Sequence, residues 1–526
     1  MAPHRDPELS RRALLALGAG LLAAACSGDD EAAPDDTAPA GSSPRPSSPP
    51  TSPAPATAAP TTAAPTTAPL PADPFRLGVA SGDPDATSVV LWTRLVGTEL
   101  PDTIDVTWEL AADDNFAEPL ATGTVTASAA HGHSVHVVVE LDGPVAYRFH
   151  AGGHTSRVGH AAPATARSSL KLAAASCQHW ETGFYTAHRD LAAWRPDAVV
   201  FLGDFIYEGA AQPVGDDRVR AHDGPEPTDL TGYRARYALY LSDPDLQAAR
   251  AACPWFPIWD DHEVENNYAG LVPQDPAEAD AFPARRLAAY QAWWEHMPVR
   301  IERPEAGRPT VVHRAARYGD LVDLVLLDGR QHRSDQACGD VTLSTDPPCP
   351  EALDPARTML GPEQEQWVAD TLAASGATWV ALAQQTVLTD LRLPNGAILN
   401  FDQWDGYAPA RERLLAAAAP VARRLVVLTG DIHLAGVGHL PGIGTEFVTT
   451  SVSSRGLVPA ELEPLVASLE HIVAAELRHR GYVRHTVTPS SWTAEYRIVA
   501  DVHDPDSAVS TWRTFTLQAG ASDAVA

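Results

Sequence analysis

The chain has 526 residues and is strongly acidic, with 67 Asp and Glu against 38 Lys and Arg and a formal net charge of −29. A surface of this charge repels phosphate backbones, so nucleic acid is excluded as a general partner. The roughly 450 residues that follow the N-terminal segments exceed the usual size of a single core, which favours more than one domain.

The first 26 residues have the order of an export signal. A pair of arginines at 11–12 precedes an apolar run over 13–25, which is too short to span a bilayer and ends at Cys26. This order predicts a twin-arginine signal peptide over residues 1–26 and an extracytoplasmic protein. The alanines before Cys26 suit a lipoprotein cleavage site, with Cys26 lipidated and attached to a membrane. Simple cleavage without lipidation is the alternative.

Residues 27–72 consist mainly of Ala, Pro, Thr and Ser with some acidic residues. A segment of this composition has almost nothing to bury, so we expect an extended, disordered linker. Such a linker would hold a folded body away from a membrane or carry it through a wall.

Short β-rich segments dominate residues 73–167. Candidate strands begin at Ser88, Asp105, Ala121, His136 and Ala146. Regular short strands separated by Gly, Asp and Pro predict a small antiparallel sandwich of the Ig-like type. The histidines at 131, 133 and 136 are expected in a solvated turn, so we expect this domain to have a structural or positioning role.

The pattern changes in residues 168–520, where apolar strands alternate with helical or loop stretches. This alternation predicts an α/β domain, with mixed strand direction. Strands are expected at residues 172–175, 198–202, 255–259, 322–327, 378–383, 425–429 and 446–450. The long connections at 209–232 and 333–358 are rich in Asp, Gly and Pro and are expected to form walls of a substrate site.

Side chains that commonly bind metals stand directly after two of these strands. Cys177 follows the first strand, and Asp204 and Tyr207 follow the second across a βαβ unit. The carboxyl ends of parallel strands meet at one sheet edge, so we expect the three side chains to converge. Thiolate, carboxylate and phenolate form an anionic set that suits ferric iron better than magnesium. Each residue alone could instead be a buried thiol, a helix cap or a core tyrosine.

Two further strand ends carry the same kind of side chain. The first has Asp260, Asp261, His262 and Glu263, followed by Asn266 and Asn267, and the second has Asp431 and His433. Four strand ends with metal-binding side chains are not expected by chance. The sequence therefore predicts a metal site at one edge of the sheet.

Two of the five cysteines are candidates for a disulfide. Cys338 and Cys349 flank a Pro-rich loop and are close enough in sequence to pair in an oxidising compartment. Cys253 has no evident partner, and we expect it to be a buried, unpaired thiol.

The strand-end motifs together resemble the alkaline phosphatase D family of the metallophosphoesterase superfamily, which is related to purple acid phosphatases. The resemblance covers most of residues 73–510. The motifs are Ser176-Cys177-Gln178, Gly203-Asp204-Phe-Ile-Tyr207-Glu208, the run from Asp260 to Asn267, Leu360-Gly-Pro-Glu-Gln-Glu-Gln-Trp, Gly430-Asp431-Ile-His433 and Val452-Ser-Ser-Arg-Gly. The resemblance implies a four-layer αββα catalytic domain over residues 168–520.

The same resemblance implies a site for ferric iron and calcium. The implied iron ligands are Cys177, Asp204, Tyr207 and His433. The implied calcium ligands are Asp204 as the bridge, Asp431, and either Asp261 or Asn266. The common metallophosphoesterase pattern has Asp and His at the first strand end and His before the last. Here Cys177 and Asp431 stand in those places, which leaves the calcium ligands open.

A pair of such cations would bind phosphate oxygens, lower the pKa of a water and stabilise the oxygens of an in-line displacement. His262 is the candidate catalytic residue, holding the phosphoryl group or protonating the leaving alkoxide, with a structural role as the alternative. Arg236 and Asn267 are candidate substrate contacts. An arginine on an amphipathic helix can instead form a surface ion pair.

The sequence thus predicts a monomeric, metal-dependent phosphoric ester hydrolase outside the cytoplasm, acting on monoesters and diesters. The resemblance to the family implies small phosphate esters, teichoic acid or phospholipid head groups as substrates. A phosphodiesterase of the phospholipase D type is the alternative enzyme. A calcium-binding surface module without catalysis is the alternative from another class.

Overall fold

The computed structural model describes residues 69–526, apart from residue 216 and residues 340–346. The predicted signal peptide, Cys26 and nearly all of the predicted linker lie outside these residues. Within the described part of the chain, no helix combines the length and the hydropathy needed to cross a membrane.

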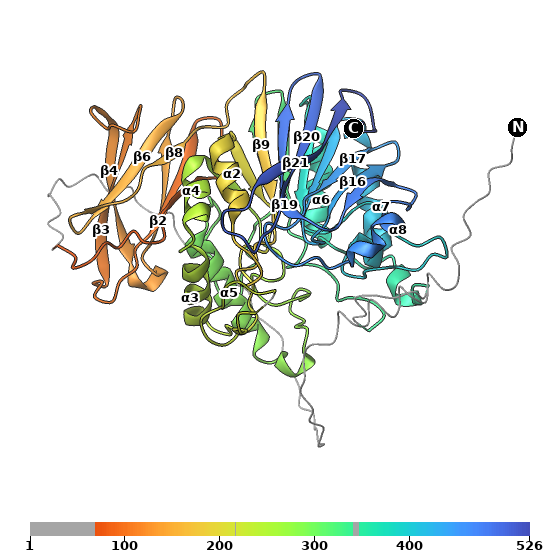
Figure 1. Cartoon of the computed structure of the whole chain (residues 1–526), viewed down its shortest axis with the longest axis horizontal. Coiled ribbons are helices and arrows are strands. Elements are labelled where there is room, and N and C mark those ends of the chain that lie inside the picture. The colour runs from red at the N-terminus through yellow and green to blue at the C-terminus, as the bar shows by residue number, and fades with distance from the viewer. Residues whose placement is uncertain (1–68, 216, 340–346) are drawn as a thin grey trace, which may run out of the picture. The chain divides into compact units, whose positions relative to one another are not determined.

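The described strands form three sheets, with helices packed around them (Figure 1). A nine-stranded sheet has the order β21-β20-β19-β9-β10-β11-β1-β2-β5. A seven-stranded sheet has the order β12-β13-β14-β15-β17-β16-β18, and a five-stranded sheet has the order β4-β3-β6-β7, with β8 pairing β6. The predicted mixed α/β class is therefore confirmed.

The nine-stranded sheet contains β1 (Val79–Gly82), β2 (Ser88–Arg94), β5 (Ser134–Glu140), β9 (Leu170–Ala175), β10 (Ala198–Phe201), β11 (Pro254–Pro257), β19 (Arg480–Val487), β20 (Ser491–Val499) and β21 (Val509–Gln518). The seven-stranded sheet contains β12 (Arg314–Tyr318), β13 (Val322–Leu326), β14 (Trp379–Gln384), β15 (Leu425–Thr429), β16 (Ala435–Leu440), β17 (Gly444–Val448) and β18 (Ile472–Glu476). The five-stranded sheet contains β3 (Thr103–Ala111), β4 (Pro119–Ser128), β6 (Val145–Ala151), β7 (His154–Thr155) and β8 (Gly159–Ala161).

The α-helices are α2 (Thr186–Trp194), α3 (Leu230–Tyr240), α4 (Pro244–Ala252), α5 (Phe282–His296), α6 (Pro362–Ala374), α7 (Ala408–Ala417) and α8 (Glu463–Val466). Short 3₁₀ turns are η1 (Ala129–His131), η2 (Pro276–Glu278), η3 (Pro350–Leu353), η4 (Trp404–Tyr407), η5 (Ala419–Val421) and η6 (Ala460–Leu462).

The seven-stranded sheet is buried on both faces, which explains why its central strands are apolar without alternation. Successive side chains of a strand point to opposite faces. In β13, Leu324 and Leu326 join the apolar cluster that contains Leu172 of the nine-stranded sheet, whereas Val325 joins the cluster that contains Val368 of α6. One face of the sheet therefore packs toward the nine-stranded sheet and the other toward helices.

The β-rich segment over residues 73–167 is divided between two sheets. Its strands β1, β2 and β5 extend the nine-stranded sheet, because β1 pairs in parallel with β11 through Ser81 and Pro254. An apolar cluster that includes Val89 and Phe149 packs this edge against the five-stranded sheet. The β-rich segment is therefore hydrogen-bonded directly to the α/β part, a feature that the sequence pattern does not reveal.

Parallel pairing aligns the strand ends that carry the predicted site residues. Phe201 of β10 pairs with Ala175 of β9 and with Pro257 of β11, and each of these strands ends within a few residues of a predicted ligand. Ser176 also forms an isolated parallel bridge with Ser451, which follows β17. This bridge ties the ends of the two large sheets together.

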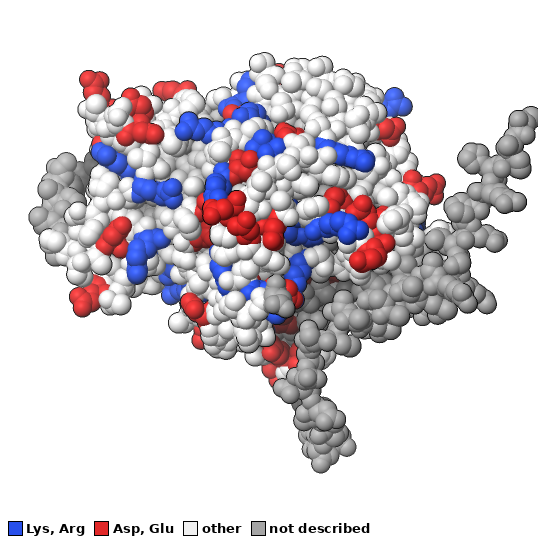
Figure 2. Space-filling view, in the orientation of Figure 1, with Lys and Arg blue, Asp and Glu red and all other residues white. Residues whose placement is uncertain are grey.

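Acidic and basic side chains are intermixed over the face of the molecule shown in Figure 2. Ion pairs bring opposite charges together, as where Asp190 lies 2.6 Å from Arg484 and 3.2 Å from Arg497. Although the chain has a net charge of −29, the face shown has no single continuous acidic patch.

Replacing Gly203 should destabilise the fold at these strand ends. Gly203 has a φ of +106°, and a Cβ there would lie 2.5 Å from the Asp260 Cβ. Because the two strand ends would have to separate, we expect Gly203→Ala to lower the free energy of unfolding by about 2 kcal/mol or more. Urea unfolding followed by circular dichroism measures this loss.

The matched control is Gly143→Ala, where an added Cβ would meet nothing within 4 Å. Its free energy of unfolding should stay within about 0.5 kcal/mol of the parent value. Equal stability of the two variants would contradict the close approach of the β10 and β11 ends.

Candidate metal centre

The predicted ligand residues meet at the ends of β9, β10, β11 and β15. Among the described residues, three groups of side chains place their ligand atoms within 4.8 Å of one another. The groups are Cys177, Asp204 and His433; Asp204, Asp261 and His262; and Asp260, Asp261 and Asp431. Because Asp204 belongs to the first two groups and Asp261 to the last two, the side chains form one continuous cluster.

Tyr207 joins the first of these groups through its hydroxyl. The Tyr207 hydroxyl donates to Asp204 Oδ2 at 2.9 Å and lies 3.0 Å from His433 Nε2. Ser454 Oγ, from the Val452-Ser-Ser-Arg-Gly motif, lies 2.8 Å from the same hydroxyl. The structure thus brings together Cys177 and the three other predicted iron ligands.

The backbone at these residues is in an uncommon conformation. Cys177, Asp204, Asp431 and His433 have φ values of 59°, 56°, 62° and 57°. Left-handed backbone at residues other than glycine persists only where the surroundings hold it firmly, and it concentrates at functional sites. The strain therefore points to the same cluster as the side-chain chemistry.

Glu263 fixes the ends of β10 and β11 relative to each other. Its buried carboxylate accepts the backbone N–H groups of Asp204, Phe205 and Asp260 at 3.1, 2.6 and 2.7 Å. Burial raises the pKa of Glu263 to about 7, although these donors oppose the rise. One carboxylate thus holds the loops that present Asp204 and Asp261.

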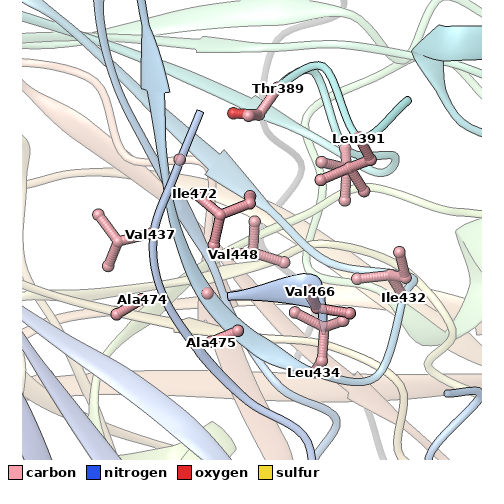
Figure 3. Close-up of a pocket in the computed structure, with 13 residues that line it drawn as sticks. Thr389, Leu391, Ile432, Leu434, Val437, Val448, Val466, Ile472, Ala474 and Ala475 are labelled. Carbon is pink, nitrogen blue, oxygen red and sulfur yellow. The ribbon is translucent and has the colours of Figure 1, made fainter. Parts of the chain in front are cut away.

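Apolar side chains that line a small pocket pack against the loop after β15. Ile432 stands between Asp431 and His433, and its buried side chain lines this pocket together with Leu434, Val448 and Val466 (Figure 3). Ile432, Leu434, Val448 and Val466 belong to one buried apolar cluster. This packing anchors the residue that stands between two predicted ligands.

The acidic side chains of the cluster are costly to bury without a cation. Burial raises the pKa of the Cys177 thiol and of the Tyr207 hydroxyl well above their usual values, and Asp204 adds to both shifts. Oδ1 of Asp204, Oδ2 of Asp260 and Oδ1 of Asp261 are buried without a hydrogen-bond partner among the described residues. Metal cations would satisfy these oxygens, so the donor set fits a metal centre.

His433 has the tautomer that a metal ligand requires. Its Nδ1 lies 2.5 Å from the carbonyl oxygen of Arg455, so Nδ1–H donates and the Nε2 lone pair faces Tyr207. Burial lowers the pKa of His433 to about 3, which keeps the imidazole neutral at physiological pH. A neutral imidazole with its second nitrogen held by a carbonyl is a common metal-ligand arrangement.

His262 is held in the opposite protonation state. Its Nδ1 lies 2.7 Å from Glu208 Oε2, and Glu208 Oε1 accepts the backbone N–H of Asn266 at 2.8 Å. Burial lowers the pKa of His262, but the carboxylates of Glu208, Asp261 and Asp204 outweigh that effect and raise it well above the usual value. His262 therefore carries a proton at neutral pH and can act as an acid.

Arg330 is a buried cation inside the acidic half of the cluster. Its guanidinium, which is fully buried, pairs with Asp260 and lies 2.8 Å from Asp402, 3.2 Å from Asp431 and 3.5 Å from Asp261. Burial and Asp402 raise the pKa of Asp431 to about 7, whereas Arg330 opposes the rise. Arg330 therefore offsets part of the repulsion among four carboxylates.

Three predicted site residues make other contacts. The Asn266 side chain donates to Gln274 Oε1 at 2.9 Å, and Asn267 contacts the cluster through its backbone N–H, which donates to Asp261 Oδ2 at 2.7 Å. Arg236 is only 3% exposed and donates to the backbone carbonyls of Tyr207 and Gly209. These contacts make Arg236 an anchor of the Tyr207 loop, which does not favour its predicted contact with substrate.

The sequence motifs gave no individual role to Asp260, Glu208, Asp402 or Arg330. Asp260 and Glu208 stand next to the predicted ligands Asp261 and Tyr207 in the sequence, and this adjacency could have indicated that they belong to the site. Arg330 was visible only as a residue near a strand end. Asp402 lies in the irregular segment between β14 and η4, where no pattern in the sequence marks it.

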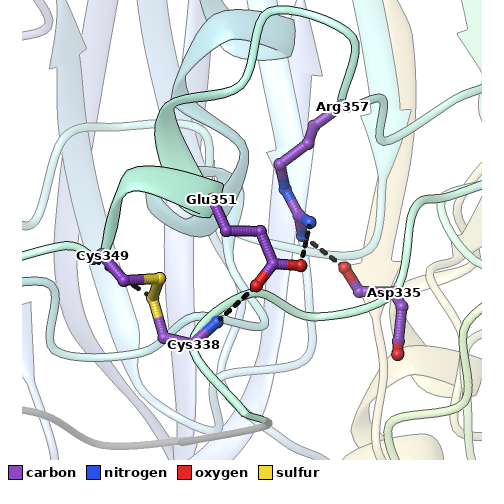
Figure 4. Close-up of a disulfide and its surroundings, with 5 residues drawn as sticks. All are labelled: Asp335, Cys338, Cys349, Glu351 and Arg357. Carbon is purple, nitrogen blue, oxygen red and sulfur yellow. Dashed lines mark hydrogen bonds and ion pairs between the residues drawn. A yellow bond between two sulfur atoms is a disulfide. The ribbon is translucent and has the colours of Figure 1, made fainter.

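The segment that carries the disulfide is connected to this network. Cys338 and Cys349 are joined by a disulfide with an S–S distance of 2.08 Å, and Glu351 accepts the Cys338 N–H and pairs with Arg357 (Figure 4). Gln336, two residues before Cys338, donates to Asp402 Oδ1 at 2.9 Å. The two other cysteines of the described chain, at 177 and 253, are free and buried.

Comparison with known families identifies the chain. A family profile described as PhoD-like phosphatase matches residues 172–496. The chain belongs to the PhoD-like phosphatase family. A second profile, described as PhoD-like phosphatase, N-terminal domain, matches residues 60–165.

Individual relatives of this PhoD-like phosphatase agree with that assignment. It is 41% identical over 477 residues to alkaline phosphatase D of Bacillus subtilis (strain 168), covering 85% of this chain and 81% of that protein. A solved structure titled "Structure of PhoD" matches with 39% identity and a TM-score of 0.81, covering 86% of this chain and 92% of that one. The predicted family and enzyme class are confirmed: the protein is a phosphoric ester hydrolase, so the calcium-binding module without catalysis is not retained.

Removing the buried guanidinium of this phosphatase should destabilise the fold. In Arg330→Met, Asp260, Asp402 and Asp431 would lose their buried partner, and breaking a buried ion pair from one side costs about 3–5 kcal/mol. We therefore expect the free energy of unfolding of the chelated, metal-free enzyme to fall by about that amount, as measured by guanidinium unfolding.

Arg317→Met is the matched control, because Arg317 also pairs with an aspartate but its side chain is 63% exposed. An exposed pair contributes about 1 kcal/mol or less. Similar losses in the two variants would contradict the role given to Arg330.

Proposed function

We propose that this hydrolase depends on metal cations held at the strand ends. The iron set would be Cys177, Asp204, Tyr207 and His433, as the resemblance to the family implies. The overlap of two ligand groups at Asp204 carries this proposal, because this carboxylate would be shared by the residues that hold the two cations. Ferric iron suits the thiolate and phenolate, and calcium suits the carboxylates.

The calcium set would be Asp204, Asp261 and Asp431, with Asp260 beside them. Asp260, Asp261 and Asp431 form one group of close ligand atoms. The side-chain amide of Asn266 is instead engaged by Gln274, which favours Asp261 over Asn266 as the calcium ligand. Arg330 and Arg333, which both pair with Asp402, supply positive charge on the same side and leave fewer negative charges for a divalent cation to balance.

When bound, the two cations would polarise the phosphoryl group and lower the pKa of the attacking water. The part played by the chain itself is proton transfer and orientation. His262, protonated and about 20% exposed at its side chain, would donate a proton to the leaving alkoxide. Glu208 would hold the imidazole through Nδ1, so that Nε2–H faces the substrate.

The cluster accounts for hydrolysis of phosphate esters without an enzyme nucleophile. Monoesters and diesters both present a phosphoryl group and a leaving oxygen, so both are proposed as substrates. Small phosphate esters, teichoic acid and phospholipid head groups share that chemistry. A phosphodiesterase of the phospholipase D type remains the second proposal. Hydrolysis of a diester also releases one alcohol from phosphorus, and that alcohol could leave from the same position as the alcohol of a monoester.

The domain organisation and the location of the protein are proposed from the sequence together with the arrangement of sheets and helices. The two large sheets, with helices against the outer face of the seven-stranded one, support a four-layer αββα catalytic domain following an Ig-like domain. The N-terminal pattern supports export by the twin-arginine pathway to an extracytoplasmic location. Lipidation at Cys26 would tether the enzyme to a membrane, and a monomer is proposed.

The test of the function combines metal analysis with substrate turnover. The purified enzyme should contain iron and calcium, and ferric iron bound by a tyrosinate should give a charge-transfer band in the visible range. It should hydrolyse a chromogenic phosphate monoester and its bis-ester, and the ratio of the two rates would rank monoesterase against diesterase. A colourless, iron-free enzyme with full activity would contradict the proposed centre.

Loss of the thiol should remove iron. Cys177 supplies the soft ligand of the proposed iron set, so Cys177→Ala should retain less than about a tenth of the iron and lose at least about 100-fold in kcat. Metal analysis and turnover of the chromogenic bis-ester measure the two effects. Cys253→Ala, which changes the other free buried cysteine, is the control and should keep the iron. Full iron content in Cys177→Ala would remove Cys177 from the centre.

Weakening the acid should affect substrates according to their leaving group. Glu208→Gln removes the carboxylate that raises the pKa of His262, so less of the imidazole would be protonated. We expect kcat to fall about 10-fold or more for an alkyl phosphate, and less than about 3-fold for p-nitrophenyl phosphate, whose leaving group needs no proton. Glu412→Gln, on an exposed part of α7, is the control. Equal losses on both substrates would contradict acid catalysis by His262.

A further inference from the structure

His179 lies in the loop that follows β9 and has no role in the proposed proton transfer. It stands two residues after Cys177 and is half-buried. Its ring centroid lies 4.5 Å from that of Tyr207 and 5.3 Å from that of His222. The His262 ring also contacts Tyr207, with centroids 4.1 Å apart, so two imidazoles border the same proposed ligand.

The main chain of His179 is fastened to the proposed iron ligands. Its backbone N–H donates to Ser454 Oγ at 3.1 Å, and its carbonyl oxygen accepts from Ser453 Oγ at 2.9 Å. Ser454 Oγ also lies 2.8 Å from the carbonyl oxygen of Cys177 and 2.8 Å from the Tyr207 hydroxyl. Movement of His179 relative to the cluster would therefore break several hydrogen bonds.

The ring of His179 has a defined tautomer. The backbone N–H of Glu181 donates to His179 Nδ1 at 3.1 Å, so Nδ1 is an acceptor and the ring hydrogen lies on Nε2. Within the described parts of the chain, Nε2–H has no hydrogen-bond partner. An oriented donor without a protein partner beside the cluster is suited to bind an anion.

We propose that His179 donates from Nε2 to a phosphoryl oxygen of the bound ester, and equally to inorganic phosphate as product. This inference rests on the proposed function, and it gives His179 a role distinct from that of His262. His262 would act on the leaving oxygen, whereas His179 holds an oxygen that stays on phosphorus. Two donors acting on different oxygens would fix the rotation of the phosphoryl group about the cations.

The test uses the enzyme with its native metals and inorganic phosphate as the probe. His179→Ala should weaken phosphate binding about 10- to 100-fold, because a hydrogen bond to a charged group is lost. His179→Gln should restore most of the affinity, since its amide Nε2 can place an N–H near the position of the imidazole Nε2. Isothermal titration calorimetry and competitive inhibition of ester turnover both measure the dissociation constant.

Metal content separates phosphate binding from simple packing against Tyr207. Both His179 variants should keep the iron and calcium content of the parent enzyme, and His503→Ala, at an exposed histidine, should match the parent in every measurement. Parent-like phosphate binding in His179→Ala would overturn the proposal. So would a loss of metal in His179→Ala that matches its loss of phosphate affinity. A parent enzyme that neither binds phosphate nor turns over esters would instead overturn the proposed function itself.

Discussion

Repulsion among buried carboxylates at the strand ends is the constraint on which the rest of the site depends. Asp204, Asp260, Asp261 and Asp431 are brought within a few ångströms by the parallel strands, and three of their oxygens have no hydrogen-bond partner in the described part of the chain. Burial makes each negative charge more costly, so the cluster needs positive charge from another source. Arg330 supplies part of that charge, and the proposed cations would supply the rest.

The fold holds the carboxylates together, against their repulsion, by fixing the backbone at the strand ends. Left-handed backbone at Cys177, Asp204, Asp431 and His433 turns each side chain inward, and the carboxylate of Glu263 and the buried Ile432 hold those turns. Hydrogen bonds from backbone N–H groups and apolar packing thus oppose electrostatic repulsion. A site assembled in this way would be ready for the proposed cations before they bind, which would reduce the cost of ordering the ligands.

Two histidines of the cluster differ in charge because burial lowers the pKa of both, and only at His262 do the carboxylates, led by Glu208, outweigh it. His433 donates to a backbone carbonyl and stays neutral, which suits a metal ligand. His262 donates to the carboxylate of Glu208 and keeps its proton, which suits an acid. The same residue type is therefore suited to two different roles, and the nearby carboxylates set which histidine keeps a proton.

The family, the apolar strands and the residues at the strand ends could be read from the sequence, because strand periodicity and short motifs are local properties. The motifs grouped Cys177, Asp204, Tyr207, Asp431 and His433 with Asp261 or Asn266 as one predicted set of metal ligands. The sequence did not reveal that Arg330 and Asp402 belong to the same cluster or that Arg236 holds a loop; both follow from contacts made in the tertiary structure. Arg330 contacts Asp402 and Asp431, which lie 72 and 101 residues away in the sequence, and no local pattern records which distant charges will share a buried space.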